Sequence, residues 1–297
     1  MDLRPLGRTN LNVSPVGFGG GEIAYRDLPA DDCACLLNHA LNLGINVFDT
    51  AECYPGGEEK IGRAIGYRRP EIILCSKVGH AKGFLRVQDW DPRLVRASVD
   101  RSLARLGTDH LDILFLHSCE LETLKDAALI DQMVQTRGTG KARAIGYAGD
   151  GDAALFAVRS GLFDVVQVSL NLADQQALDK LLPEAKERGV GVIIKRALAN
   201  AAWRPPAPNP GDYRFDYYQR LTALELEALA KPNAAELALR FSLHQAGVHC
   251  ALIGTTLREH LDAAVVAWNA GPIPPRELAL IRARWKQVAK PSWVGLT

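Results

Sequence analysis

The chain alternates repeatedly between a short apolar run rich in β-branched residues and a longer stretch with helical spacing. No other feature of the sequence constrains its fold as strongly. Eight runs have the character of strands, at residues 16–19, 45–48, 72–75, 111–116, 144–147, 165–168, 190–194 and 250–253. Continuous apolar runs are typical of parallel strands that are buried on both faces. We therefore expect eight parallel strands, each followed by a connection that returns the chain to the same end of the sheet.

Helical stretches separate these runs. Apolar residues recur at helical spacing over 31–43, 93–106, 174–188, 233–246, 258–269 and 275–288. Gly44 ends the first of these stretches, and Asp91 with Pro92 opens the second as cap and first-turn residue. The first 14 residues alternate weakly around residues 7–10, which predicts a short β-hairpin before the main fold.

Eight strand–helix units most naturally close into a (β/α)8 barrel. At about 150 residues per domain, 297 residues would suggest two domains, but such barrels use about 250 residues as one. We expect a single domain over residues 1–297, with the hairpin at its start and an extra helix at its end. The alternative is an open doubly wound sheet with a dinucleotide-binding G-x-G-x-x-G turn. It is disfavoured because Glu22 stands where the last glycine of that motif is required.

Charge and cysteine content narrow the class of protein. Lys and Arg number 35 and Asp and Glu 34, which gives a net charge of +1 and predicts neither a nucleic-acid partner nor a membrane surface. No signal-peptide core or membrane-spanning apolar run is present in the sequence, and the six cysteines form no C-x-x-C pair. We expect reduced thiols and a cytoplasmic location, and the sequence leaves the oligomeric state open.

Ionisable residues stand at the ends of three successive apolar runs. Asp49, Lys77 and His117 follow the second, third and fourth runs, and Tyr54 comes five residues after Asp49. The C-terminal ends of barrel strands meet at one mouth, so these groups should converge there. Taken singly, each residue is explained equally well by a structural role. Asp49 could cap the next segment, His117 could be a buried core histidine, and Lys77 could lie outside the mouth.

A metal-dependent hydrolase is a further alternative for the same mouth. It would need several His or carboxylate ligands. Only His117, Asp49, Glu52 and His80 are available, and no His-x-His follows the first strand. We therefore predict no metal.

Several motifs resemble those of the aldo-keto reductases. They include residues 44–54 (Gly-Ile-Asn-Val-Phe-Asp-Thr-Ala-Glu-Cys-Tyr) with Glu58 and 61–65, segments 6–9 and 13–19, Ser76-Lys77, Leu116-His117, Ala144-Ile145-Gly146, and 254–256 with 259–261. The resemblance covers nearly the whole chain. Its most specific part is the order Asp49, Tyr54, Lys77 and His117 on successive strands.

The resemblance implies an oxidoreductase that reduces aldehydes or ketones with NADPH, or with NADH as the alternative. It implies that Tyr54 is the general acid, that Lys77 and Asp49 tune it, and that His117 orients a small-molecule carbonyl substrate. The physical logic agrees, because a tyrosine of pKa near 10 needs help to exchange a proton, and a neighbouring ammonium lowers that pKa.

The resemblance also implies a set of cofactor-binding residues, namely Gly20, Gly21, Asp49, Gln167, Lys195, Arg196, Gly254, Thr255, Arg258 and His260. The sequence departs from the family at several of them. Ala148-Gly149 replaces a Ser-Asn pair that usually holds the carboxamide, and Lys195 or Arg196 replaces an aromatic platform. The altered carboxamide contacts motivate a second hypothesis, a nucleotide-binding regulatory or sensor protein of the same fold with little turnover.

Segment 203–218 combines four prolines with five aromatic residues. A stretch of this composition forms neither helix nor central strand, and it follows the seventh strand, so we expect it on the rim. It is interpreted either as a stiff surface loop or as a lid over the substrate pocket. Tyr25, Phe84 and Trp90 are further candidates for the pocket wall.

Overall fold

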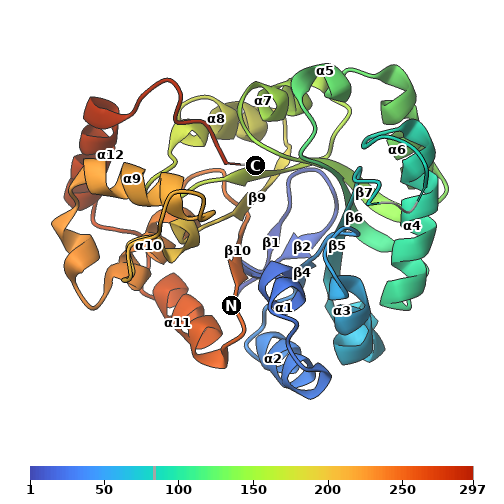
Figure 1. The fold of residues 1–297 in the computed structure, drawn as a ribbon, viewed down its shortest axis with the longest axis horizontal. Coiled ribbons are helices and arrows are strands. Elements are labelled where there is room, and N and C mark those ends of the chain that lie inside the picture. Colours follow the sequence, from blue (N-terminus) through green and yellow to red (C-terminus); the bar gives the residue numbers. More distant parts are fainter. Residues whose placement is uncertain (83–84, 297) are drawn as a thin grey trace.

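The computed structural model describes residues 1–82 and 85–296, in which eight parallel strands close into a barrel. Figure 1 shows the barrel from one end, with helices packed around it. In chain order the barrel strands are β3 (Val16–Gly19), β4 (Val47–Asp49), β5 (Ile73–Val78), β6 (Leu111–His117), β7 (Ala142–Ala148), β8 (Val165–Ser169), β9 (Gly191–Lys195) and β10 (Cys250–Gly254). The last strand pairs with the first, with Ala251 beside Val16, which confirms the predicted (β/α)8 barrel.

Helices and short 3-10 segments alternate with these strands. They are α1 (Gly21–Tyr25), α2 (Ala30–Asn42), α3 (Gly57–Ile65), η1 (Gly66–Glu71), α4 (Pro92–Leu106), α5 (Leu121–Leu124), α6 (Ala127–Gly138), α7 (Gly151–Ser160), η2 (Gln176–Leu178), α8 (Leu181–Glu187), η3 (Ala199–Ala201), α9 (Phe215–Leu224), η4 (Glu227–Ala230), α10 (Ala234–Leu243), α11 (Arg258–Asn269) and α12 (Pro275–Val288). None of the described helices combines the length and the apolar character that crossing a bilayer requires.

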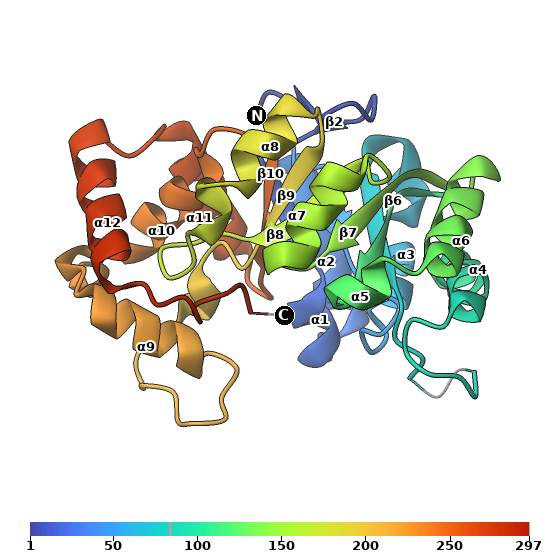
Figure 2. The ribbon, with the colours of Figure 1, turned by 90° about the horizontal axis from the view of Figure 1, so that it is seen from above.

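The predicted N-terminal hairpin is present and closes the bottom of the barrel. Strands β1 (Arg4–Pro5) and β2 (Asn12–Val13) pair antiparallel, and Leu6 and Leu11 join the apolar side chains that fill the bore. Gly7 in the turn has φ of +53°, and a Cβ there would lie 2.4 Å from the amide nitrogen of Gly191. Figure 2 shows the hairpin at one end of the barrel and the segment before α9 at the other.

Several strands extend further than the sequence predicted, and the extensions contain the charged residues. Asp49 and His117 are the last residues of β4 and β6, and Lys77 lies inside β5. Charged side chains disfavour a strand interior when they have no partner, but here the bore supplies the partners described below. The ionisable groups therefore sit on rigid strands and not on the loops after them.

The predicted helix over 174–188 is wrong in its first half. Asp174 forms an isolated bridge with Asn171, and the chain makes only the short η2 before α8 begins. A single helix would put Pro183 in its interior, where it lacks an amide hydrogen and clashes with the preceding turn. The chain instead starts α8 two residues before Pro183, where proline is tolerated in the first turn.

Other predicted helices are confirmed with ends that differ by at most three residues, whereas α1, α3, α5, α6, α7 and α9 were not anticipated. In segment 203–218, residues 203–212 form no helix, as predicted. Helix α9, however, begins at Phe215, so Tyr217 and Tyr218 belong to a helix and Tyr217 is buried. Phe84, a predicted pocket residue, lies outside the described residues.

Candidate active site

The structure brings the four predicted catalytic residues together at the C-terminal mouth of the barrel. Asp49 ends β4, Lys77 lies in β5, and His117 ends β6, so three adjacent parallel strands deliver them to one place. Tyr54 follows in the loop between β4 and α3. These positions follow directly from the barrel, in which every strand points its C-terminal end at the same face.

A buried ion pair forms the base of the site. The Lys77 Nζ donates to Asp49 Oδ2 at 2.6 Å and to the carbonyl oxygen of Thr50 at 2.7 Å, and the Gln167 Nε2 donates to Asp49 Oδ1 at 2.8 Å. Asp49, Lys77 and Gln167 are almost fully buried. Burial lowers the pKa of Lys77, but the Asp49 carboxylate and Tyr54 together outweigh burial, so the pKa of Lys77 lies above its ordinary value. The ammonium is therefore charged at neutral pH.

The Tyr54 ring lies directly beside this ammonium. The Lys77 Nζ stands 5.3 Å from the ring centroid, and the Tyr25 ring lies 5.5 Å away on another side. Lys77 is the strongest single influence on the pKa of Tyr54 and lowers it, as predicted. Burial, together with Asp49, raises it by more, so the net pKa of Tyr54 lies above its ordinary value. Tyr54 is consequently a protonated hydrogen-bond donor at neutral pH, held next to a cation that favours its conjugate base.

His117 lies on the other side of Tyr54. The two rings meet edge to face with centroids 6.1 Å apart, and the Trp90 Nε1 donates to the His117 carbonyl oxygen at 2.7 Å. Burial, then Lys77 and His80, hold the pKa of His117 well below its usual range, so its imidazole is neutral. Trp90 thus supports the backbone of His117 and does not line the main cavity.

A cavity of about 550 Å³ opens above these groups. It is lined by ten of the residues named from the sequence, Gly21, Asp49, Tyr54, His117, Gln167, Lys195, Arg196, Gly254, Thr255 and His260. Lys77 lies beneath its floor. Gly20 and Arg258 are not among the lining residues: the Gly20 amide donates to the Asp49 carbonyl oxygen at 2.7 Å, and Arg258 opens helix α11.

Segment 203–218 contributes Trp203, Arg204 and Tyr213 to the same cavity, and Tyr25 lines it as well. Both interpretations of the segment place it on the rim, and that is where it lies. Glu52, by contrast, faces away from the mouth. It is buried and paired with Arg101 and Arg105 of α4, with 3.7 Å between the Arg105 Nη1 and Glu52 Oε1.

Asp150 supports the site through Lys195, although it was not among the site residues named from the sequence. Its carboxylate lies 2.8 Å from the Lys195 Nζ and accepts from the Ser169 amide at 2.6 Å and from the Ser169 hydroxyl at 3.1 Å. The carboxylate thus joins the end of β9 to the end of β8. A carboxylate directly after the Ala148-Gly149 departure was the only signal for this role, and pairing over long range cannot be read from one sequence.

Arg196 has a buried side-chain nitrogen that a bound dinucleotide could satisfy. Its backbone is left-handed, with φ of +57°, and its Nη1 is buried with no hydrogen-bond partner among the described residues. A buried guanidinium nitrogen without a partner is costly unless an anionic or polar group completes it. Arg196, beside Gly254 and Thr255 in the same cavity, therefore fits the phosphate or nicotinamide portion of a dinucleotide.

Residues 15–286 match the model of the aldo/keto reductase family. The chain belongs to this family. It is 31% identical over 286 residues to the L-galactose dehydrogenase of Arabidopsis thaliana, covering 90% of this chain and 88% of that protein. It is 27% identical over 302 residues to the NADH-specific methylglyoxal reductase of Escherichia coli, covering 89% and 93%.

A solved aldo-keto reductase of Bacillus halodurans, in its holo form, shares the fold over 99% of both chains, with a TM-score of 0.80 and 25% identity. The predicted resemblance is thereby confirmed. As an aldo/keto reductase with oxidoreductase relatives, the protein is a carbonyl-reducing oxidoreductase of the kind that uses a nicotinamide cofactor.

Proposed function

We propose that this aldo/keto reductase reduces a small aldehyde or ketone to the alcohol, with Tyr54 as the general acid. The observation that supports this role is the placement of the Lys77 ammonium between the Asp49 carboxylate and the Tyr54 ring, 2.6 Å from the first and 5.3 Å from the centroid of the second. When bound, NADPH or NADH would supply the hydride.

The chain's own residues would handle the proton and the carbonyl oxygen. Tyr54, protonated at neutral pH, donates its hydroxyl proton to the oxygen as negative charge develops on it. Lys77 stabilises the tyrosinate that remains, and Asp49 keeps Lys77 charged and fixed in place. His117 is neutral, so it offers an N–H to the same oxygen without bringing a second positive charge into the site.

For the dinucleotide, we propose NADPH as the preferred form and NADH as the alternative. We assign the 2′-phosphate to His260, which lines the cavity with Gly254 and Thr255, and to Arg258, which lies outside the cavity lining in the same first turn of α11. The His260 Nδ1 lies 2.8 Å from the Thr255 hydroxyl, which fixes that ring at the cavity wall. Titration of the protein with NADPH and with NADH tests the preference, and a lower dissociation constant for NADH would contradict it.

The test of the whole proposal is turnover of 4-nitrobenzaldehyde, first with NADPH and then with NADH. Tyr54→Phe should lower kcat by about 10²- to 10⁴-fold, the usual contribution of a positioned general acid. Tyr67→Phe is the matched control, because Tyr67 is highly exposed and its hydroxyl donates to Asn38 away from the mouth. Equal rates for wild type and Tyr54→Phe would show that the role given to Tyr54 is wrong.

One observation favours the second candidate, a nucleotide-binding regulator with little turnover. Ala148 and Gly149 offer no side-chain hydrogen bond after β7, and Asp150 is already engaged by Lys195 and Ser169. Micromolar or tighter nucleotide binding without turnover, on a panel that includes aldoses and is run in both directions, would support it. Rapid turnover would exclude it.

A further inference from the structure

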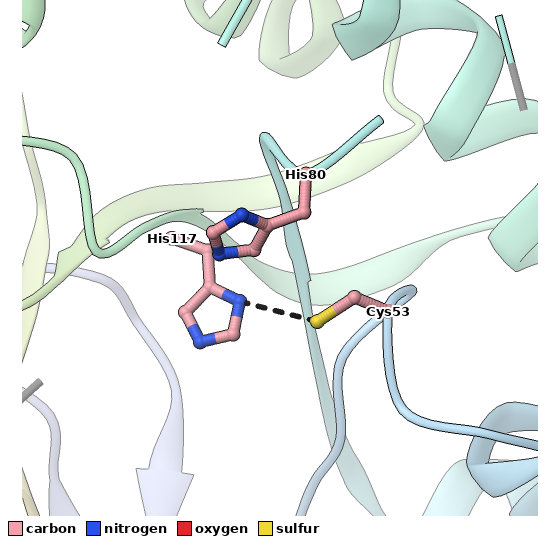
Figure 3. Close-up of side chains that lie close together, drawn as sticks. All are labelled: Cys53, His80 and His117. Atoms are coloured by element: carbon pink, nitrogen blue, oxygen red, sulfur yellow. Dashed lines mark hydrogen bonds between the residues drawn. The ribbon is translucent and has the colours of Figure 1, made fainter. Parts of the chain in front are cut away.

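Two histidines and a cysteine meet on the wall of the mouth next to the catalytic pocket. Cys53 comes from the loop after β4, His80 from the loop after β5, and His117 from the end of β6. Each can offer one ligand atom, and these atoms lie within 4.8 Å of one another. Within residues 1–82 and 85–296 this is the only such cluster of three, and all three residues are half-buried at the mouth (Figure 3).

The spacing of two members already suits a tetrahedral metal ion. The Cys53 Sγ lies 3.6 Å from the His117 Nδ1. With Zn–S and Zn–N bonds of about 2.3 and 2.0–2.1 Å, two ligands of a tetrahedral zinc are about 3.5 Å apart. Cys53 and His117 therefore need almost no movement to hold one ion between them, and His80 needs a shift of about 1 Å or a change of side-chain torsion.

The third member is oriented by a carboxylate. The His80 Nδ1 donates to Asp89 Oδ2 at 2.9 Å, while Asp89 Oδ1 accepts from the Ala81 amide at 2.8 Å. Because its Nδ1 is engaged by Asp89, His80 has Nε2 left as the atom that can coordinate an ion. Figure 3 shows its ring lying over His117 and facing the cluster. A carboxylate behind a histidine is the arrangement that orients and strengthens metal-binding imidazoles.

The donor set determines the kind of ion. One thiolate and two imidazoles suit Zn²⁺ and ions of similar softness, whereas Mg²⁺ and Ca²⁺ require oxygen ligands. The nearby Lys77 ammonium is already neutralised by Asp49, and Asp89 adds negative charge behind His80. Three protein ligands leave a fourth position to water, as in zinc sites that remain open to solvent.

We propose that Cys53, His80 and His117 bind one Zn²⁺ or a similarly soft divalent cation, and that the bound ion inhibits the enzyme reversibly by fixing the His117 ring through its Nδ1, so that the ring can no longer turn to orient the substrate carbonyl. The inhibitory half of this proposal rests on the proposed function, in which His117 orients the carbonyl oxygen. The binding half rests only on the cluster and on the Asp89–His80 pair.

Binding is tested with Co²⁺ as a spectroscopic substitute for Zn²⁺. One equivalent of Co²⁺ added to the full-length reduced protein should give a thiolate-to-cobalt charge-transfer band and intense tetrahedral visible bands, and Zn²⁺ should displace both. Cys53→Ser and His80→Asn should lose these bands. Asp89→Asn should weaken the affinity by about 10- to 100-fold, which is the usual effect of losing an outer-shell partner.

Matched controls separate this site from incidental binding. Cys35→Ser removes an exposed thiol on α2, and His110→Asn breaks an exposed His–Asp pair with a 2.6 Å contact. Both variants should bind Co²⁺ as wild type does. Absence of the thiolate band in wild type, or equal bands in wild type and a folded Cys53→Ser variant, would overturn the proposal.

Inhibition is tested separately by steady-state turnover. Low micromolar Zn²⁺, but not Mg²⁺, should inhibit wild type, EDTA should restore activity, and Cys53→Ser and His80→Asn should require at least 10-fold more Zn²⁺. Zn²⁺ inhibition that is unchanged in both variants would overturn the inhibitory half. If no carbonyl is turned over by any variant, the proposed function fails, and the cobalt bands alone decide whether the metal site exists.

Discussion

Replacing Lys77 by methionine tests the electrostatic origin of the proposed acid. Methionine keeps much of the volume of the side chain but removes its charge. At 5.3 Å, a unit charge interacts with a charge at the Tyr54 ring by about 3 kcal/mol when the effective dielectric constant is about 20. That energy corresponds to a rise of about 2 in the pKa of Tyr54, which already lies above its ordinary value.

The shift has a defined sign in each reaction direction. Alcohol oxidation needs the deprotonated tyrosine, so its rate rises with pH through the pKa of Tyr54. Lys77→Met should move that alkaline limb upward by about 2 pH units and lower the oxidation rate at pH 8 by about 100-fold. Carbonyl reduction uses the protonated form, so it should slow because a tyrosine of higher pKa is a weaker acid, and the pH at which its rate falls off should also move upward. The measurement is kcat/KM against pH in both directions.

The same substitution also affects stability, and a second variant separates the two effects. Lys77→Met leaves the Asp49 carboxylate buried with only the Gln167 amide as side-chain partner, at a cost of about 3–5 kcal/mol. Adding Asp49→Asn removes the orphaned charge and should recover most of the melting temperature. Because Lys77 influences Tyr54 more than Asp49 does, a smaller alkaline shift should persist in the double variant. A limb that stays at its wild-type pH in both folded variants would refute the reasoning.

Three further outcomes are expected. Burial, then Asp150, raises the folded-state pKa of Asp174 from 3.8 to about 7, so its contribution to stability is full below about pH 4 and is lost as the pH rises through 7. Asp174→Asn should therefore gain in melting temperature over wild type between pH 4 and pH 8, and a constant difference would contradict this. Gly7→Ala should lower the free energy of unfolding by about 2 kcal/mol or more, because its φ is +53° and its Cβ would lie 2.4 Å from a backbone nitrogen. Gly140→Ala has φ of +78° and nothing within 4 Å of its Cβ, so it should lose only the part of the free energy of unfolding that comes from backbone conformation. Equal losses of unfolding free energy for the two variants in a denaturant titration would argue against the steric clash at Gly7. Arg196→Ala should raise the dissociation constant for the nicotinamide dinucleotide by about 10- to 100-fold, the range for a hydrogen bond to a charged group, and an unchanged constant in calorimetry would remove Arg196 from the binding site.

The sequence was sufficient to predict the barrel because its strands have an unambiguous signal. A run such as 111–116 is apolar on both faces, and eight such runs admit few closed arrangements. Helices on the outside have a weaker signal. In α3, four charged residues fall among nine positions, and its packing against α2 and α4 stabilises it more than its intrinsic propensity does. Without that tertiary context, α3 was not anticipated.

The candidate site divides in the same way. Asp49, Lys77 and His117 could be placed at one mouth because their positions at strand ends are a local property of the sequence. The net direction of the shift in the Tyr54 pKa could not be predicted. It depends on burial competing with Lys77, and the burial of Tyr54 is known only when the loops are in place. The pairing of Asp150 with Lys195 joins residues 45 apart in the chain, and the cluster of Cys53 with His80 and His117 spans three separate segments.

The Asp49 carboxylate has a consequence for how this protein can change over evolutionary time. Its two oxygens bind Lys77 on the neighbouring strand β5 and Gln167 on β8, and β4 and β8 stand diametrically opposite in the closed strand order. A single side chain therefore ties the two walls of the barrel together at the level of the mouth and sets its width. New substrate preferences would have to arise in the rim segments, such as the one that contains Trp203 and Tyr213, because widening the barrel itself would break the contacts that hold the acid in place.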